Sequence, residues 1–293
     1  ITEHVEQNKL IEFVNKNKID GILVRSATKI TKDIIDQCSS IKLIGRGGVG
    51  MDNIDVKYAK EKGIHVINTP SASSSSVAEL VFTHLFSMAR HTYHANRTMP
   101  LEGDFNFKQL KKSYSNGTEL RNKTIGIIGF GRIGQEVAKI GIGIGMNVLF
   151  YDKDIRNHTI SLNFYNSHEV EFKLKRTDFS DLLINSDMIT LHVPKQEKPL
   201  ISAKELNSMK KGALIVNTSR GGVINEADLI KNLNKQHLKC AGLDVYQNEP
   251  TPNMEILMHE HIALSPHIGA STMEAQKRIG LELAEQVNNI FNG

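Results

Sequence analysis

The stretch from Thr124 to Asp152 reads TIGIIGFGRIGQEVAKIGIGIGMNVLFYD, and it decides the fold of the chain. It begins with a short apolar run bounded by glycine, which predicts a strand buried on both faces of a sheet. The motif GFGRIG follows, with Gly129, Gly131 and Gly134, and apolar residues then recur at helical spacing. A second apolar run ends at Asp152. The stretch therefore predicts one strand–helix–strand unit of a parallel sheet.

Each part of the glycine motif suits the binding of a dinucleotide. Gly129 permits a tight turn, Gly131 lets the backbone approach a pyrophosphate, and Gly134 lets the helix pack close to the sheet. The N–H groups at the start of the helix bind phosphate oxygens. Asp152 can accept hydrogen bonds from a ribose diol and repel a 2′-phosphate. The unit predicts a dinucleotide site that prefers NAD to NADP. The alternative is a glycine-rich turn in an ordinary strand–helix–strand unit.

Length and composition fit a globular protein of two domains. The 293 residues are 40% hydrophobic and 23% charged. The net charge of +4 suits a small anionic substrate, although a solvated lysine-rich surface explains it equally well. No basic run interleaved with aromatics indicates nucleic acid, and no apolar stretch approaches a membrane span. With no signal peptide visible and two cysteines that read as buried thiols, we expect a cytoplasmic protein.

Strands and helices alternate along the rest of the chain, which predicts parallel sheets in both domains. Segments 98–118 and 154–176 lack clear periodicity, so we expect surface excursions without regular structure there. The expected strands are 19–24, 41–44, 64–67, 188–193, 213–217, 241–245 and 262–264, and the expected helices are 32–38, 54–62, 74–97, 204–209, 226–233 and 272–291.

Three polar residues of the second half lie just past strand ends, where open α/β sheets bind ligands. They are Arg220, Glu249 and His267. Oxidation of a 2-hydroxy acid needs a base such as histidine, a carboxylate that favours the imidazolium, and an arginine for the substrate carboxylate. Alternatively, Arg220 is a surface cation, Glu249 is a turn residue and His267 is a capping group. His192 also follows a strand and competes as the base, although its neighbours offer it no evident partner.

Two arginines follow successive strands of the first half. Arg25 and Ser26 come after the first strand, and Arg46 lies in the glycine-rich run GRGGVG. Exposed N–H groups of such a run can bind an anion, and a plain flexible turn is the alternative. Two arginines exceed what one carboxylate needs, so we expect a second anionic group, a phosphate, on the substrate.

These motifs resemble, in order, those of the D-isomer-specific 2-hydroxyacid dehydrogenases. The resemblance covers nearly the whole chain, and within the family it is closest to the short-form D-3-phosphoglycerate dehydrogenases. The motifs that carry it are VRSATKIT (24–31), GRGGVGMDNID (45–55), NTPSASSSSVAEL (68–80), GTELRNKTIGIIGFGRIG (117–134), NTSRGG (217–222), AGLDVYQNEP (241–250) and SPHIGAST (265–272).

The resemblance implies NAD-dependent oxidation of D-3-phosphoglycerate to 3-phosphohydroxypyruvate, the first step of phosphorylated serine biosynthesis, by a homodimer without a metal. Alternatives are a glyoxylate or hydroxypyruvate reductase, another D-2-hydroxyacid dehydrogenase, or an NAD-sensing corepressor-type binding protein. By resemblance, Arg220 binds the substrate carboxylate and carbonyl, His267 is the acid/base, and Glu249 tunes His267. The implied cofactor contacts are Thr69, Gly129, Gly131, Arg132, Ile133, Gly134, Asp152, Thr218, Ser219, Asp244 and Gly269, and the implied substrate contacts are Arg25, Ser26, Arg46, Val49 and Gly50.

The resemblance also implies an α/β fold of two Rossmann-like or flavodoxin-like, doubly wound parallel-sheet domains with a cleft between them. Residues 1–97 and 266–293 would form the substrate domain, and residues 98–265 the inserted NAD-binding domain. Against the family pattern, the first strand–helix unit is nearly absent, so we expect an incomplete sheet in the substrate domain. No regulatory domain follows Gly293 in this sequence, so feedback control through such a domain is not expected.

Overall fold

The structure is a computed structural model that describes residues 5–292. The chain divides into two compact units. Unit 1 combines the residues up to Ser73 with those from Ala270 onward, and unit 2 is Ser74–Gly269. The expected boundaries at 97/98 and 265/266 therefore differ from those of the units. The reason is that the first helix of unit 2 packs against its sheet and belongs to its core.

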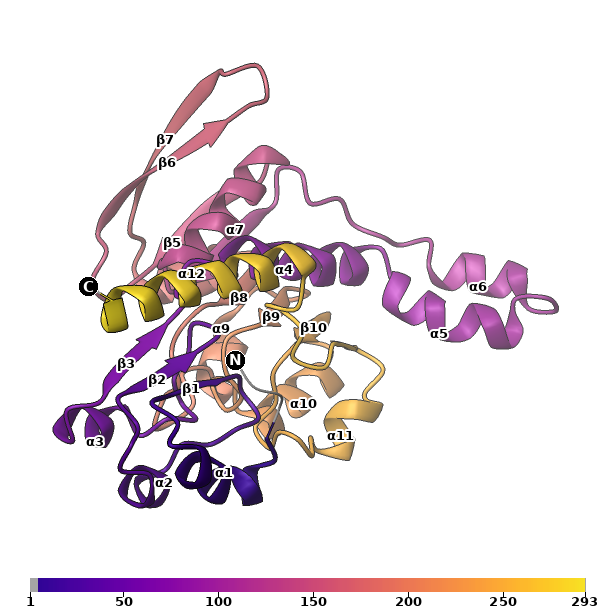
Figure 1. Cartoon of the computed structure of the whole chain (residues 1–293). Helices are drawn as coiled ribbons and strands as arrows, with labels where there is room; N and C mark the ends of the chain where they lie inside the picture. Colours follow the sequence, from indigo (N-terminus) through magenta and orange to yellow (C-terminus); the bar gives the residue numbers. More distant parts are fainter. Residues whose placement is uncertain (1–4, 293) are drawn as a thin grey trace. The chain divides into compact units, whose positions relative to one another are not determined.

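Unit 2 contains a parallel sheet, which within the described residues has six strands in the order β11-β10-β9-β8-β4-β5 (Figure 1). The reversal of strand order between β4 and its neighbours is that of a doubly wound α/β sheet. The strands are β4 (Thr124–Ile128), β5 (Asn147–Tyr151), β8 (Met188–Leu191), β9 (Leu214–Asn217), β10 (Cys240–Leu243) and β11 (Ile262–Leu264).

Helices cover both faces of this sheet, so the strands are apolar on both sides. Ile127 and Val216 face the core that α4 and α7 complete, whereas their neighbours Ile128 and Ile215 face the opposite core. The helices on the first face are α4 (Ser74–Ala89) and α7 (Arg132–Gly143), and those on the second are α8 (Phe179–Asn185), α9 (Ala203–Ser208), α10 (Glu226–Asn234) and α11 (Met254–Met258). The α/β doubly wound prediction is confirmed for this unit.

The expectation of an irregular segment over 154–176 is wrong. Strands β6 (Asn157–Asn163) and β7 (Glu169–Lys175) pair there as an antiparallel hairpin (Figure 1). Ile160 is fully buried in the core of α4 and α7, and Phe172 packs against the same core. Alternate residues of the hairpin, Ile160 and Leu162 in β6 and Phe172 and Leu174 in β7, therefore pack on this core, whereas Val170 is exposed.

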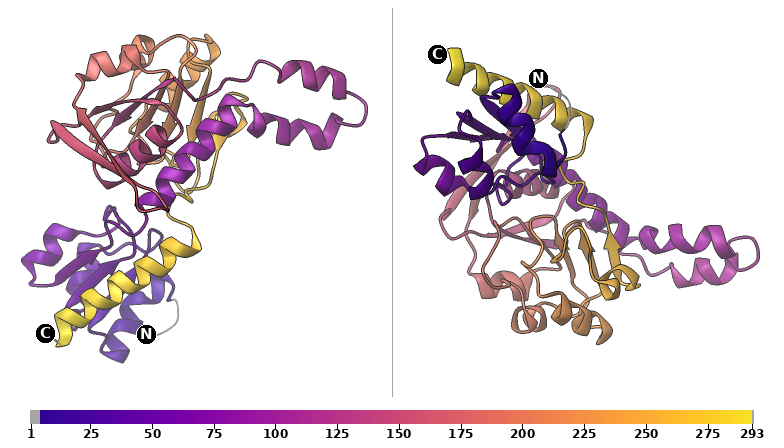
Figure 2. Two further views of the ribbon diagram at one scale, coloured as in Figure 1. Left: turned by 90° about the horizontal axis from the view of Figure 1, so that it is seen from above. Right: turned by 60° about the horizontal axis from the view of Figure 1, so that its bottom comes forward.

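The expected helix over 74–97 and loop over 98–118 are also corrected. Helix α4 stops at Ala89 because His91 adopts left-handed backbone angles, with a φ of 57°. Helices α5 (Thr92–Glu102) and α6 (Phe107–Ser113) follow and form a helical hairpin that projects from the body of unit 2 (Figure 2).

Unit 1 has a parallel sheet of three strands within the described residues, in the order β1-β2-β3. Strand β1 forms one edge, beside an apolar groove of about 570 Å³ that Leu10, Phe13 and Leu23 help to line. No helix within residues 5–292 is long and apolar enough to cross a membrane. The elements are η1 (Gln7–Lys9), α1 (Leu10–Asn17), β1 (Gly21–Val24), α2 (Lys32–Gln37), β2 (Leu43–Arg46), α3 (Val56–Glu61), β3 (His65–Asn68) and α12 (Met273–Asn292).

Candidate active site

The three glycines of the motif lie in the turn after β4 and in the first turn of α7. Gly129 has a φ of 91°, and a Cβ on it would overlap the carbonyl of His192. A Cβ on Gly134 would overlap the carbonyl oxygen of Gly129, so the start of α7 sits directly on the turn. Around Gly131, the N-cap of α7, the described residues other than its two neighbours place no atom within 4 Å of the position of a Cβ. There is therefore open space beside the N-cap of α7, where a phosphate could approach the first N–H groups of the helix.

Asp152 follows β5 and binds the glycine turn. Its Oδ2 accepts from the backbone N–H of Phe130 over 2.7 Å, and its Oδ1 accepts from Asp154 and Ile155 over 2.9 and 3.1 Å. Burial opposes ionisation, but these donors and the charge of Lys153 outweigh it, so the pKa of Asp152 lies below its ordinary value. Asp152 is thus an anion that also braces the turn, a structural role that the sequence did not reveal.

Two of the expected cofactor contacts carry buried hydroxyl oxygens that lack a hydrogen-bond partner among residues 5–292. They are Thr218 Oγ1, directly after β9 in unit 2, and Thr69 Oγ1, directly after β3 in unit 1. A buried hydroxyl without a partner costs free energy, so each is suited to a ligand that completes it. Within unit 2, the hydroxyl of Thr218 and the open N-cap at Gly131 both fit a dinucleotide.

His267 and Glu249 form a close pair. The Nδ1 atom of His267 lies 2.7 Å from Glu249 Oε2, and Glu249 Oε1 accepts from the N–H of Tyr246 over 3.0 Å. Because a carboxylate only accepts, Nδ1 carries the hydrogen of the neutral ring, and Nε2 keeps its lone pair. The His267 side chain is 43% exposed, so Nε2 can reach a substrate. This is the arrangement that an acid/base histidine needs.

Arg220 lies in the turn after β9, and that turn meets the same segment. A Cβ on Gly221 would overlap the carbonyl of Tyr246, so the turn and residues 246–247 are in direct backbone contact. Arg220 is oriented by a bond from its Nη1 to the Ser219 carbonyl (2.7 Å). The loop of Arg220 and the Glu249–His267 pair therefore meet at Tyr246.

Tyr246 is a site residue that the sequence analysis missed. The single hydrogen of its hydroxyl is shared between the carbonyls of Leu243 (3.1 Å) and Ser265 (2.8 Å), and thereby ties the end of β10 to the end of β11. Burial raises its pKa to about 12, so it stays a donor at neutral pH. The segment AGLDVYQNEP contained it, but no spacing rule pointed to it.

Asp244, expected as a cofactor contact, holds the loop of His267. It is 1% exposed. Its Oδ1 accepts from the N–H of Ile268 and its Oδ2 from the N–H of Gly269, each over 2.9 Å. Both donors follow His267 directly, so Asp244 orders the backbone on one side of the imidazole, while Glu249 orders its ring.

His192, the competing base, is in a different environment. Its Nε2 lies 3.0 Å from Thr190 Oγ1, and its buried Nδ1 has no hydrogen-bond partner in the part of the chain that the structure describes. Burial lowers the pKa of His192 to about 3. Such a ring remains neutral through the physiological range and is a poor proton acceptor.

The expected substrate contacts of unit 1 gather at the carboxyl edge of its sheet. Arg46 ends β2 and pairs in register with Val24, so Arg25 follows on the neighbouring strand. The guanidinium of Arg46 lies against Gly48, whose φ is 146°. The carbonyl of Val49 accepts from the Asn68 side chain at the end of β3. Ser26 and Gly50 lie in the same two loops.

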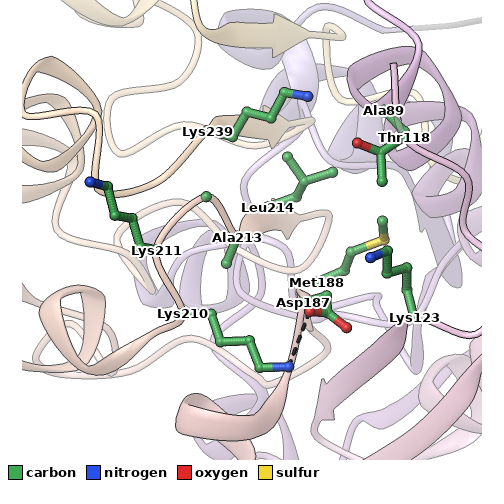
Figure 3. A pocket seen from close by; sticks show the side chains of 11 residues that line it. Ala89, Thr118, Lys123, Asp187, Met188, Lys210, Lys211, Ala213, Leu214 and Lys239 are labelled. Carbon is green, nitrogen blue, oxygen red and sulfur yellow. Dashed lines mark hydrogen bonds and ion pairs between the residues drawn. The ribbon is translucent and has the colours of Figure 1, made fainter. Parts of the chain in front are cut away.

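A lysine-lined cavity of about 220 Å³ lies at the opposite, amino edge of the sheet of unit 2 (Figure 3). Lys123, Lys210 and Lys239 line it, and Asp187 forms an ion pair with Lys210 over 3.0 Å. None of the expected site residues lines this cavity. The cavity is therefore separate from the expected site, whose residues in unit 2 follow the carboxyl ends of the strands.

Comparison with known proteins gives the family of the chain. Residues 82–269 match the family model of the D-isomer specific 2-hydroxyacid dehydrogenase, NAD binding domain. A hydroxypyruvate reductase from Thermotoga maritima is 41% identical over 98% of this chain and 89% of its own length. A D-3-phosphoglycerate dehydrogenase from Methanocaldococcus jannaschii is 41% identical over 96% of this chain but only 52% of its own length. The chain thus spans about half the length of that relative.

Solved structures show the same fold. The NAD-dependent formate dehydrogenase of Staphylococcus aureus, in complex with NAD, is 30% identical, with a TM-score of 0.78 over 96% of this chain and 82% of its own. A glyoxylate reductase from Paecilomyes thermophila is 30% identical, with a TM-score of 0.81 over 98% and 86%. Because the family model covers more than half of the chain and a close relative matches nearly all of it, NAD is the cofactor, and the chain belongs to the D-isomer specific 2-hydroxyacid dehydrogenases.

Proposed function

We propose that the chain oxidises D-3-phosphoglycerate to 3-phosphohydroxypyruvate, the entry reaction of phosphorylated serine biosynthesis. The observation that carries this proposal is the pair Arg25 and Arg46 at the ends of adjacent strands. Two guanidinium groups on one sheet edge suit a phosphate, which accepts their paired N–H donors. Arg220 and the backbone at Val49 and Gly50 would then be left to bind the substrate carboxylate.

The residues of unit 2 supply the acid/base part of the reaction. NAD, when bound, provides the acceptor for the hydride that leaves C2 of the substrate. The hydroxyl proton passes to Nε2 of His267, and Glu249 stabilises the imidazolium that results through Nδ1. Arg220 holds the carboxylate next to the reacting carbon and polarises the carbonyl that forms.

A second candidate is the reduction of hydroxypyruvate or glyoxylate. The relative from Thermotoga maritima favours it, because that hydroxypyruvate reductase matches along 89% of its length whereas the phosphoglycerate dehydrogenase from Methanocaldococcus jannaschii matches over 52%. This reaction would use Arg220, Glu249 and His267 in the same way. It has less need of Arg25 and Arg46, because the substrate carries no phosphate.

The two candidates separate in an experiment on Arg46. Arg46→Ala should lower kcat/KM for 3-phosphoglycerate. The loss of transition-state binding free energy should be on the order of 2–3 kcal/mol, the scale of a charged hydrogen bond. The kcat/KM for glycerate, which lacks the phosphate, should change little. Arg46→Lys keeps the charge and serves as the matched control for the planar fork. Equal losses on both substrates would remove the phosphate role, and absence of turnover with phosphoglycerate, glycerate and lactate would favour an NAD-sensing binding protein.

We propose that Asp152 sets the preference for NAD over NADP. Asp152→Ala should weaken NAD binding more than NADP binding, since the lost carboxylate both accepts from the ribose and repels a 2′-phosphate. Fluorescence titration with NADH and NADPH measures both affinities. Because Asp152 also braces the Phe130 turn, Asp152→Asn is the control that keeps one acceptor oxygen. Equal weakening for both cofactors in Asp152→Asn would contradict the proposal.

We further propose a homodimer held through α5 and α6. Leu101 and Phe105 of this hairpin are 74% and 76% exposed, and Phe107 is 55% exposed. Such an apolar patch on a projecting hairpin is typical of a protein interface. Light scattering should give twice the chain mass for the native protein and a lower mass for Leu101→Glu with Phe105→Glu. A native monomer at micromolar concentration would refute this assembly.

A further inference from the structure

A buried chain of hydrogen bonds leads from α4 to the loop that carries His267. His84 lies on α4 and is 5% exposed. Its Nε2 is 2.9 Å from Ser265 Oγ, and Ser265 Oγ donates to Asp244 Oδ1 over 2.6 Å. Three side chains from three segments are thus joined inside the core of unit 2, next to residues that directly flank the proposed base.

The direction of these bonds fixes the tautomer of His84. A serine hydroxyl has a single hydrogen, and that of Ser265 is donated to Asp244. Ser265 Oγ can therefore meet His84 only as an acceptor, so Nε2 of His84 carries the hydrogen. Burial lowers the pKa of His84, against an opposing effect of Asp244, so the ring is neutral at neutral pH. It acts as a donor of one hydrogen bond.

The position of the ring is also fixed by its packing. A Cβ on Gly242 of β10 would lie 2.9 Å from Cβ and 3.0 Å from Cγ of His84. Only a glycine leaves room for the imidazole between α4 and β10. The ring is therefore seated against the sheet, with Nε2 directed to the residue after β11.

Asp244, at the other end of this chain of hydrogen bonds, binds the backbone around His267. Asp244 accepts from the N–H groups of Ile268 and Gly269. His267 itself has a φ of 55°, a left-handed conformation that is uncommon outside glycine, although histidine adopts it more often than most residues do. Such a conformation persists only where surrounding bonds hold it. The two N–H bonds to Asp244 are those bonds on one side of His267.

We propose that His84 is a positioning residue that acts through Ser265 and Asp244 to hold His267 in the conformation that presents Nε2 to the substrate. The inference rests on the proposed role of His267. Without the donor at His84, Ser265 has one fewer constraint and can turn its hydroxyl away. Asp244 then binds the N–H groups of Ile268 and Gly269 less rigidly, and residue 267 can leave the left-handed region.

Two substitutions of His84 separate the effect of its hydrogen bond from the effect of the space that its side chain fills. His84→Leu fills similar space but cannot donate, and we expect kcat to fall roughly tenfold while the KM for NAD stays within about twofold. His84→Gln can place an amide N–H near the position of Nε2, and it should restore kcat to within about threefold of the native value. Ser265→Ala interrupts the same chain and should match His84→Leu, so it replaces that variant if His84→Leu does not fold.

Met88→Ala is the matched control, because Met88 is a fully buried residue of the same helix that is not part of the chain of bonds. It should lower thermal stability while leaving kcat within twofold at temperatures well below unfolding. Equal kcat for His84→Leu and Met88→Ala would overturn the proposal, and so would a His84→Gln variant as slow as His84→Leu.

Amide hydrogen exchange provides a readout that does not depend on the substrate. In the protein without substrate, the N–H groups of Ile268 and Gly269 should exchange at least several-fold faster in His84→Leu than in the native chain, and at native rates in Met88→Ala. Unchanged exchange would overturn the role of His84 whatever the enzyme oxidises. Native activity of His267→Asn would instead refute the proposed function and leave the exchange result standing.

Discussion

Two histidines follow parallel strands of the same sheet, and their surroundings differ in every respect that matters for proton transfer. His267 has a carboxylate 2.7 Å from Nδ1 and a half-exposed ring. His192 has a threonine hydroxyl at Nε2 and a buried Nδ1 without a partner among residues 5–292. The comparison teaches that a histidine at a strand end is not by itself a candidate base. The group that orients the ring and the solvation of its free nitrogen decide its role.

Replacing each histidine tests this comparison with the largest expected effect. His267→Asn should lower kcat by roughly 10²–10⁴-fold, the usual contribution of general acid–base catalysis, while NADH binding stays nearly native. His192→Asn should change kcat by far less, because that ring does not exchange a proton with the substrate. Steady-state rates and NADH titration measure both. Comparable losses in the two variants would erase the distinction.

The carboxylate partner is the second difference to test. In Glu249→Gln, an amide oxygen can still accept from His267 Nδ1, but the negative charge that favours the imidazolium is gone. We expect turnover to fall by roughly 10- to 100-fold, as when the partner that orients a functional histidine is changed. The acid limb of the pH–rate profile should move to lower pH.

The matched control for Glu249→Gln is Glu260→Gln. It removes the same charge from a histidine–glutamate pair outside the site, in which Glu260 lies 3.6 Å from His261 Nε2. Its pH–rate profile should be native. A native profile in Glu249→Gln as well would remove Glu249 from its role.

The burial of His192 should appear as a loss of stability in acid. Its folded-state pKa is about 3, whereas the unfolded chain protonates near 6.5. Below about pH 6.5 the unfolded state binds a proton at His192 that the folded state does not bind. The contribution of neutral His192 to the free energy of unfolding is therefore complete above that pH and is lost as the pH falls towards 3. Between pH 7 and pH 5, His192 lowers the free energy of unfolding by about 2 kcal/mol.

Urea unfolding of the protein without cofactor measures this effect. His192→Asn should lose less stability than the native chain over the interval from pH 7 to pH 5, while the other buried histidines cancel in the difference. Parallel stability curves for the two proteins would mean that His192 is solvated, and the contrast with His267 would then rest on Glu249 alone.

Much of the fold could be predicted because buried parallel strands have a distinctive composition. Apolar runs such as Ile125–Ile128 and Leu214–Val216 mark strands whose two faces are both covered. The β6–β7 hairpin was missed although Val170, Phe172 and Leu174 alternate with charged residues, because the segment was judged by its overall polarity and not by this period of two. Helix α6 and the second half of α5 were missed because they have little apolar periodicity, and the break between α4 and α5 was missed because it depends on a left-handed turn at His91.

The residue types of the candidate site could be predicted from their positions at strand ends, but the hydrogen bonds that hold them could not. Arg220, Glu249 and His267 could be named because polar groups at the carboxyl edge of a parallel sheet are brought together by topology. His84 could not, because its partner Ser265 lies 181 residues away in sequence. Tyr246 was equally hidden, since a tyrosine gains its role here only through the two carbonyls that meet its hydroxyl.

The composition of unit 1 from two distant segments has a consequence for how the chain matures. Helix α12 packs Ile279 and Leu283 against Ala72 and completes a small core of that unit. Gln286 also donates to the Asn68 carbonyl at the end of β3. During synthesis, these contacts cannot form until the whole of unit 2 has been made. Unit 2 can fold as the ribosome advances, whereas unit 1 must keep part of its apolar surface uncovered until the last helix arrives.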